Sequence, residues 1–170
     1  MIDGMTSAPA GRRVSPRDPR IDTWRSFLSA HIRLQRLLDD DLQSEHGLSL
    51  PEYDALLVLA NAPDRRLRMH QVADRVLLTR SGVTRLIDRL VADGSVERTQ
   101  CATDARGAEA VLTEAGLARL REASGTHLRG IGDHFLDAID PADLDVVGRA
   151  MRDVLAGLEA GETAENRRTG

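Results

Sequence analysis

The chain has 170 residues, of which 41% are hydrophobic and 29% are charged, and its formal net charge is −4. This length suits one domain with a real core, or a small domain joined to a helical dimerisation region, and it excludes two large independent domains. Aromatic residues make up only 2% of the chain, so the core must be aliphatic, which favours packed helices over a β-sandwich.

Positive charge is concentrated in the middle of the chain. Between Asp64 and Gly107 the arginines outnumber the acidic residues by three, whereas the remainder of the chain is acidic. All 23 basic residues are arginines, a bias that a GC-rich genome alone would produce. The planar guanidinium nevertheless suits phosphates and guanine edges, which it binds with two hydrogen bonds. The charge distribution therefore permits a nucleic-acid partner in spite of the acidic total.

Other classes of function lack their sequence signatures. The single cysteine, Cys101, excludes an internal disulfide and a cysteine-rich zinc site. No phosphate loop, dinucleotide-binding motif or zinc-protease motif occurs, so we expect neither an enzyme, nor a cofactor, nor a metal site. The N-terminus has no apolar signal region and no apolar run is long enough to span a membrane, so we expect a cytoplasmic protein without a membrane partner.

Blocks of apolar residues divide the chain into elements. Residues 1–20 and 161–170 have no apolar period, which predicts a disordered N-terminal arm and a disordered tail. Residues 21–45 carry apolar side chains at spacings of three and four, typical of one long amphipathic helix that ends at Gly47. Ser49 and Glu52 have the spacing of a capping box and predict a short second helix.

Residues 48–113 have the element order of a winged helix-turn-helix domain. Residues 67–69 allow only an edge β-bridge, and residues 70–77 predict a helix of about two turns. Thr79 follows a tight turn as the N-cap of a second helix, which ends in an αL-type C-cap at Asp93-Gly94. Residues 95–100 and 108–112 predict a β-hairpin, which would be the wing.

Two more helices are predicted after the wing. Thr113 caps a helix over residues 114–138, which several glycines weaken. Its side chains expected to face inward are Leu117, Leu120, Leu128, Ile131 and Phe135. Asp140-Pro141 begin a last helix, whose apolar residues recur like a coiled-coil seam. The fold class is therefore mostly α (α+β): a winged helix-turn-helix with a helical dimerisation region over residues 21–47 and 114–160.

The helix that follows Thr79 has an outer face suited to DNA. This face carries Arg80, Ser81, Thr84, Arg85 and Arg89. Arginines reach guanine O6 and N7 or phosphates, and serine or threonine hydroxyls reach either. The second helix of a helix-turn-helix enters the major groove, so these five residues are the candidate DNA contacts. An ordinary solvated helix has a similar outer face, so the wing is needed as a second signal.

Asp104 and Arg106 lie at the tip of the predicted hairpin. The carboxylate, two positions before the arginine, can hold the guanidinium extended for insertion into a narrow minor groove. A surface turn can contain the same pair by chance. The alternative is therefore a winged-helix protein-interaction module without DNA binding, whose recognition helix would have an apolar outer face.

Residues 48–116 resemble the MarR family of bacterial regulators, most specifically in TRSGVTRLIDRLVADGSVER, in the wing DAR and in the following LTEAG. The resemblance extends over about residues 24–158. It implies a homodimer that sets two winged helices on a pseudo-palindromic site in double-stranded DNA. It also implies repression that a small effector, often aromatic and acidic, relieves.

The resemblance also assigns roles by position. Ser81, Thr84 and Arg85 would face bases or nearby phosphates. Arg106 would enter the minor groove, and Asp104 would orient it. The sequence departs from the family at two positions. Position 105 is often charged in the family but is Ala105 here, which leaves this wing less basic. His70 stands where a better N-cap residue is usual.

Family members bind effectors in the crevice between the dimerisation helices and the winged helix. The resemblance implies that the first two helices line this crevice, and the candidate residues here are Trp24, His31 and Tyr53. Each of the three also suits core packing or a contact between helices.

Overall fold

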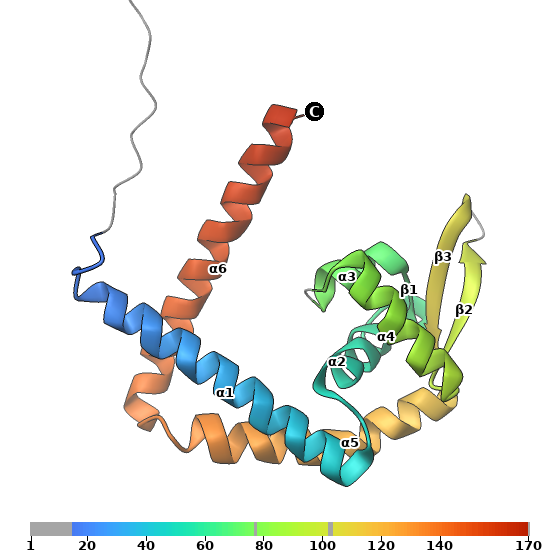
Figure 1. Cartoon of the computed structure of the whole chain (residues 1–170), viewed down its shortest axis with the longest axis horizontal. Coiled ribbons are helices and arrows are strands. Elements are labelled where there is room, and N and C mark those ends of the chain that lie inside the picture. Colours follow the sequence, from blue (N-terminus) through green and yellow to red (C-terminus); the bar gives the residue numbers. More distant parts are fainter. Residues whose placement is uncertain (1–14, 77, 102–103, 170) are drawn as a thin grey trace, which may run out of the picture.

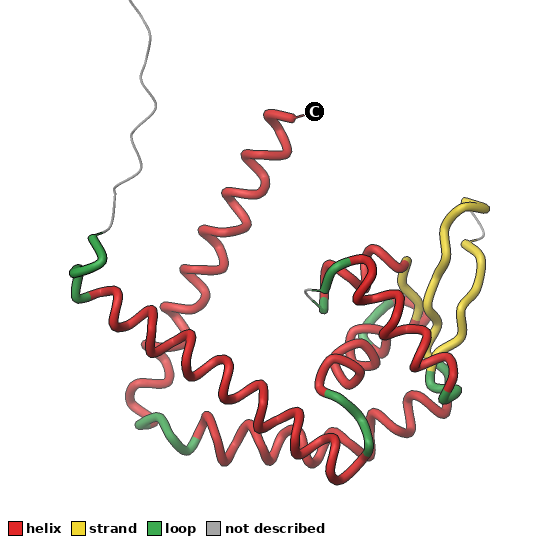
Figure 2. Tube along the Cα trace, in the orientation of Figure 1, coloured by secondary structure: helices red, strands yellow, loops and turns green. Residues whose placement is uncertain are grey.

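A computed structural model describes residues 15–76, 78–101 and 104–169. Helices dominate, and a small three-stranded sheet lies at one end of the molecule (Figures 1 and 2). In chain order the elements are α1 (Arg20–His46), α2 (Leu50–Ala60), the 3-10 turn η1 (Pro63–Arg65), β1 (Arg66–Arg68), α3 (Met69–Arg75), α4 (Arg80–Ala92), β2 (Val96–Cys101), β3 (Asp104–Leu112), α5 (Glu114–Ile131), the π-helical turn η2 (Gly132–Leu136) and α6 (Pro141–Thr169). This order confirms the mostly helical winged helix-turn-helix.

Local capping explains where α2, α4 and α5 begin. In α2 the capping box forms as predicted: Ser49 Oγ accepts a hydrogen bond from Glu52 N, and Glu52 Oε2 accepts one from Ser49 N. Thr79 and Thr113 cap α4 and α5 through hydrogen bonds from Gly82 N and Gly116 N. Each threonine or serine satisfies an amide that the helix leaves without a partner, which fixes the first turn.

The sheet forms the wing and the edge of the core. Its strand order is β1-β3-β2, and both pairings are antiparallel. β1 pairs Leu67 with Ala110 and is a full edge strand rather than a single bridge. β3 begins at Asp104, four residues before the predicted strand 108–112, because backbone pairing between strands does not require an apolar side-chain pattern.

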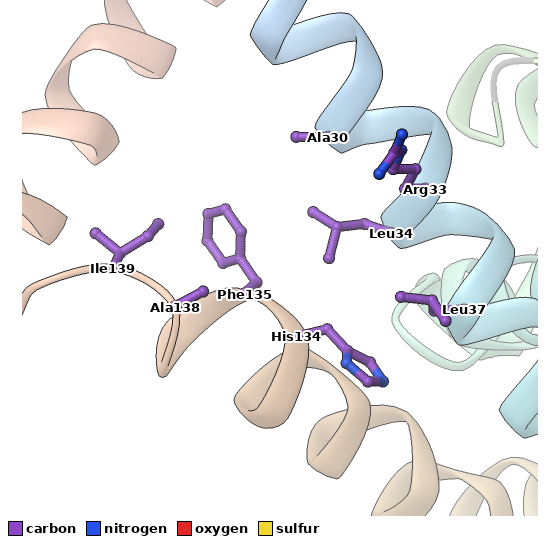
Figure 3. Close-up of a pocket in the computed structure, with 8 residues that line it drawn as sticks. All are labelled: Ala30, Arg33, Leu34, Leu37, His134, Phe135, Ala138 and Ile139. Carbon is purple, nitrogen blue, oxygen red and sulfur yellow. The ribbon is translucent and has the colours of Figure 1, made fainter.

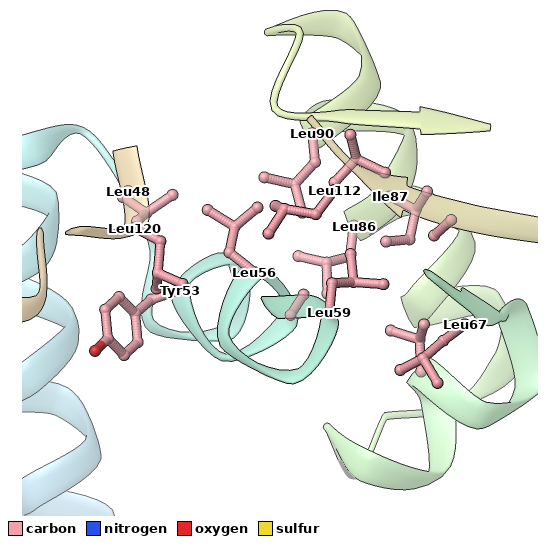
Figure 4. Packing of buried hydrophobic residues seen from close by; sticks show 14 of the residues in the cluster. Leu48, Tyr53, Leu56, Leu59, Leu67, Leu86, Ile87, Leu90, Leu112 and Leu120 are labelled. Carbon is pink, nitrogen blue, oxygen red and sulfur yellow. The ribbon is translucent and has the colours of Figure 1, made fainter. Parts of the chain in front are cut away.

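The hydrophobic core lies between α2, α4 and the sheet (Figure 4). Leu56 and Leu59 from α2 meet Leu86, Ile87 and Leu90 from α4, and all five side chains are buried. Val96 and Leu112 close this core from the base of the wing. Because α4 buries one whole side in the core, its opposite side has a defined orientation.

Outside the winged helix, α1 and α5 lie side by side and α6 projects away from both (Figure 1). Glu45 near the end of α1 accepts hydrogen bonds from Thr126 Oγ1 at 2.8 Å and from Arg129 NH2 at 2.5 Å. Thr126 also bonds to His46 Nε2 at 2.8 Å. These contacts hold the two long helices together within one chain.

Three sequence predictions about helices are wrong. α3 begins at Met69 with Arg68 at the N-cap, and Gln71 accepts from Arg68 N, so His70 lies inside the first turn rather than at the cap. Leu128 is 65% exposed, not inward, because α5 packs against its own chain on one side only, and Phe135 lies beyond α5 in η2, where it is 38% exposed at the edge of a pocket beside α1. The predicted disordered tail is wrong for residues 161–169, where α6 continues; Ala, Glu and Arg in this stretch favour a helix. Residues 1–14 of the predicted arm lie outside the described residues.

Candidate nucleic-acid interface

The outer face of α4 is polar and firmly held. Val83, Leu86, Ile87 and Leu90 are each at most 1% exposed, so the helix cannot rotate about its axis without breaking the core. Ser81, Thr84 and Arg85 then lie on the exposed side, as the sequence predicts. The side chain of Arg80 is outside the described part of the structure. α4 therefore presents hydroxyls and a guanidinium on a rigid support.

Arg89, another predicted contact on α4, forms an ion pair with a carboxylate of α2. Its Nε donates to Glu52 Oε1 at 2.7 Å, and Glu52 is buried. Burial by itself would raise the pKa of the Glu52 carboxyl, but hydrogen bonds from Arg89 and Ser49 outweigh burial and leave that pKa lowered. The carboxylate thus joins the capping box of α2 to the recognition helix. Arg89 serves to anchor α4.

This ion pair predicts a pH-dependent effect of Glu52→Gln. Because the folded pKa is lowered, the carboxylate stabilises the fold above its unfolded pKa, and this stability is lost as the pH falls through the folded value. At pH 7 we expect Glu52→Gln to lower the free energy of unfolding by about 1 to 2 kcal/mol, since Arg89 loses a charged partner. In urea titrations at a series of pH values, the difference from wild type should shrink below about pH 4.

Glu114→Gln is the matched control for Glu52→Gln. Glu114 pairs with Arg65 at 2.6 Å, but its side chain is 83% exposed. An exposed pair contributes little, so this variant should unfold like wild type. If both glutamine variants behave alike at every pH, the Glu52 carboxylate does not anchor α4.

The wing is tied to α4 at its base. Arg98 on β2 pairs with Asp88 on the outer side of α4, with NH2 and Oδ1 2.9 Å apart. The β2–β3 hairpin projects beyond the helices (Figure 1). The backbones of Asp104 and Arg106 belong to β3, at the far end of this hairpin. The side chains of residues 101–107 lie outside the described part, so the pairing of Asp104 with Arg106 stays a prediction.

A pocket of about 560 Å³ lies between α1, α2 and the turn that leads into α4. Its lining residues are His31, Gln35, Leu50, Pro51, Asp54, Leu57, Val58, Arg75, Val76 and Leu78. Burial raises the pKa of the Asp54 carboxyl. No sequence pattern marks Arg75, at the end of α3, as a lining residue. The pocket therefore combines an apolar wall with one acidic side chain, Asp54, and one basic side chain, Arg75.

Of the three predicted effector contacts, only His31 lines this pocket. Trp24 is 55% exposed and packs against Phe27 near the start of α1. Tyr53 is buried between α2 and α5, where its ring lies 4.4 Å from that of His127 and its hydroxyl donates to Ser124 Oγ. Tyr53 is thus outside the pocket because its face of α2 packs on α5, and Trp24 is outside it because it lies near the start of α1.

The described residues form neither a membrane-spanning helix nor a metal-binding cluster. None of the helices there has the length and apolar character needed to cross a bilayer. The same residues bring no three His, Cys, Asp or Glu side chains close enough together to hold a metal ion.

Comparison with known proteins agrees with this geometry. A MarR family model matches residues 46–107. The chain is 35% identical over 85 residues to the HTH-type transcriptional repressor YetL of Bacillus subtilis, a match that spans only 51% of YetL.

Two solved structures match nearly the whole fold. Sco3205, a MarR family transcriptional regulator from Streptomyces coelicolor solved in complex with DNA, is 32% identical with a TM-score of 0.78, over 89% of this chain and 93% of Sco3205. AbsC, another MarR family regulator from Streptomyces coelicolor, is 30% identical with a TM-score of 0.78, over 87% of this chain and 99% of AbsC. The chain belongs to the MarR family of transcriptional regulators, in agreement with the polar outer side of α4 and the wing beside it.

Proposed function

We propose that the protein is a sequence-specific transcriptional regulator that binds a pseudo-palindromic operator as a homodimer and represses until a small effector binds. The observation that carries this proposal is the polar outer face of α4, fixed by four buried side chains on its other side. An apolar outer face, expected of a protein-interaction module, is not what α4 presents. The DNA complex of Sco3205 and the repressor name of YetL support the same function.

The two DNA-contacting parts should read DNA differently. Thr84 and Arg85 lie on the helix expected in the major groove, where every base pair has a distinct pattern of donors and acceptors. Arg106 lies on the hairpin expected in the minor groove, where an arginine senses groove width and negative potential. The helix would therefore set sequence preference, and the wing would add affinity on any sequence.

Substitutions in the helix and in the wing should therefore change DNA affinity in different ways. Arg85→Ala should weaken operator binding by about 1 to 3 kcal/mol and random-duplex binding by less. Arg106→Ala should weaken both by similar amounts, and Asp104→Ala should reproduce part of that loss by removing the orienting carboxylate. The measurement is fluorescence anisotropy at one salt concentration, on an operator that wild type selects from random duplexes. If Arg106→Ala binds both duplexes like wild type, the wing assignment is wrong.

The same assay tests the function itself. Wild-type affinity should fall with salt on a log-log slope of several units, because arginines release counterions from the phosphates. Footprinting should show two protected half-sites about one helical turn apart. If wild type selects no duplex, the protein-interaction module is the better description.

A second copy of the chain is the proposed partner of the long helices. The exposed apolar residues of α6 form one face, the α6 seam: Val146, Met151, Val154, Leu155 and Leu158. A second apolar surface is a pocket of about 330 Å³ between α1 and the η2–α6 connection, lined by Leu34, Leu37, Phe135 and Ile139 among others (Figure 3). Exposed apolar area of this kind is typical of an obligate interface.

The pocket beside α4 is the proposed effector site. Val76 and Leu78 line it and directly precede Thr79, the N-cap of α4. Arg75 offers a cation for an acidic group, and Leu57 and Val58 offer apolar contact for a ring. A bound effector would press on the turn that positions the recognition helix. As a DNA-binding regulator, the protein would act in the cytoplasm by binding rather than by catalysis.

A further inference from the structure

The winged helix joins the long helices at a joint that the chain crosses twice. The first crossing is residues 47–49, between α1 and α2, and the second is Thr113, between β3 and α5. Two such crossings define an axis about which the winged helix can pivot relative to α1 and α5. The packing of α2 on α5 limits this pivot, and the polar contacts beside the crossings limit it further.

Arg119, on the second turn of α5, bonds to both sides of this joint. Its NH2 donates to the carbonyl oxygen of Gly47 at 2.9 Å, at the end of α1. Its NH1 donates to the carboxylate of Asp93 and contacts Ser95 Oγ at 3.5 Å, in the turn between α4 and β2. One guanidinium therefore connects α5, the end of α1 and the end of the recognition helix.

The partners of Arg119 are themselves fixed. Asp93 Oδ1 accepts from Ser95 N at 2.9 Å, and the carbonyl oxygen of Ser95 accepts from Thr113 N at 3.1 Å. Only 26% of the Arg119 side chain and 37% of that of Asp93 are exposed. Charge-assisted hydrogen bonds are about twice as strong as neutral ones, and partial burial reduces their screening by salt. The brace therefore consists of charge-assisted hydrogen bonds that salt screens only in part.

We propose that Arg119 is a positioning residue for operator binding: by bracing the joint, it sets the separation of half-sites that the dimer accepts. This inference rests on the proposed function. Half-sites lie about 10 to 10.5 bp apart on successive turns of DNA, so one added base pair rotates a half-site by about 34° and shifts it along the axis by about 3.4 Å. A rigid dimer rejects such an operator, whereas a pivoting one tolerates it.

The test measures affinity against half-site spacing. Operators selected by wild type are remade with spacers shortened or lengthened by one and two base pairs, and a duplex with a single half-site is added. The full-length variants are Arg119→Gln and Asp93→Asn, which break the brace from either side. Arg121→Gln is the matched control: Arg121 is exposed on the same helix and forms no ion pair among the described residues.

Wild type and Arg121→Gln should lose at least about tenfold in affinity when the spacer changes by one base pair. Arg119→Gln and Asp93→Asn should lose about tenfold on the preferred spacer, with the difference between spacers reduced to about threefold and single half-site binding unchanged. Arg119→Lys should restore part of the spacer preference, since it keeps one charged donor.

Two results would overturn the proposal. One is that Arg119→Gln and Asp93→Asn both show the same dependence of affinity on spacer length as wild type. The other is an equal loss on every spacer and on the single half-site, which would mean a loss of folding stability only. If circular dichroism shows that Arg119→Gln does not fold, the spacer dependence of Asp93→Asn decides the test. A wild-type protein that selects no DNA refutes the proposed function as well, which separates the two failures.

Discussion

Met151→Glu is expected to make the protein a monomer at micromolar concentration and to weaken operator binding by about 100-fold, within the range by which linking two binding modules raises affinity. Met151 lies within the α6 seam, and its own chain leaves it exposed. A carboxylate buried at an apolar interface without a partner costs several kcal/mol, more than most single contacts contribute. A monomer then holds one half-site only.

Analytical ultracentrifugation and anisotropy on the selected operator measure the two effects of Met151→Glu. The matched control is Ala156→Glu, which adds the same charge to the exposed part of α6, on the side opposite the seam. This control should remain dimeric. If Met151→Glu is dimeric and the control is not, the interface lies on the other side of α6.

Gly116→Ala is expected to destabilise the fold by about 2 to 4 kcal/mol, the range of severe core substitutions. Gly116 lies in the first turn of α5, directly against the joint. An added Cβ would lie 2.0 Å from the backbone oxygen of Ser95 and 2.8 Å from Leu112 Cδ1. The backbone of the α4–β2 turn would have to move, and the Thr113 and Arg119 contacts would be lost with it. The gain of about 1 kcal/mol in helix propensity is too small to compensate.

Gly125→Ala is the control for Gly116→Ala. It lies on the same helix, and a Cβ there meets nothing within 4 Å. This variant should stabilise the protein by about 0.5 to 1 kcal/mol through helix propensity. Both free energies of unfolding come from urea titrations at one protein concentration, because a dimer's stability depends on concentration. Equal stabilisation by both substitutions would contradict the close approach at Gly116.

Sequence predicts the local features of this fold well. Ser49, Thr79 and Thr113 are good N-cap residues, and each begins the helix that its position indicates. The apolar period of α4 also predicts its outer face, because the buried side and the polar side belong to the same helix. Such features depend on residues within four positions of each other.

The sequence does not predict contacts between residues that are far apart along the chain. The Arg89 side chain suits phosphate as well as Glu52, and only the packing of α2 on α4 selects the carboxylate. Arg119 reaches Gly47 and Asp93 from a third element, which no spacing reveals. Periodicity marks Leu128 and Tyr53 as apolar-face residues but does not say what covers them: Tyr53 packs on α5, whereas Leu128 is left 65% exposed.

The Asp88–Arg98 pair constrains how a new operator preference could evolve. Asp88 occupies the outer side of α4, so changing it is an obvious route to a different base preference, but the change would leave Arg98 without its acid. A freed guanidinium beside DNA would bind phosphate and raise affinity for every sequence. The first mutation would therefore relax specificity, and a second one at position 98 would be needed to recover it. Mutational histories that alter recognition at position 88 should pass through both sites together.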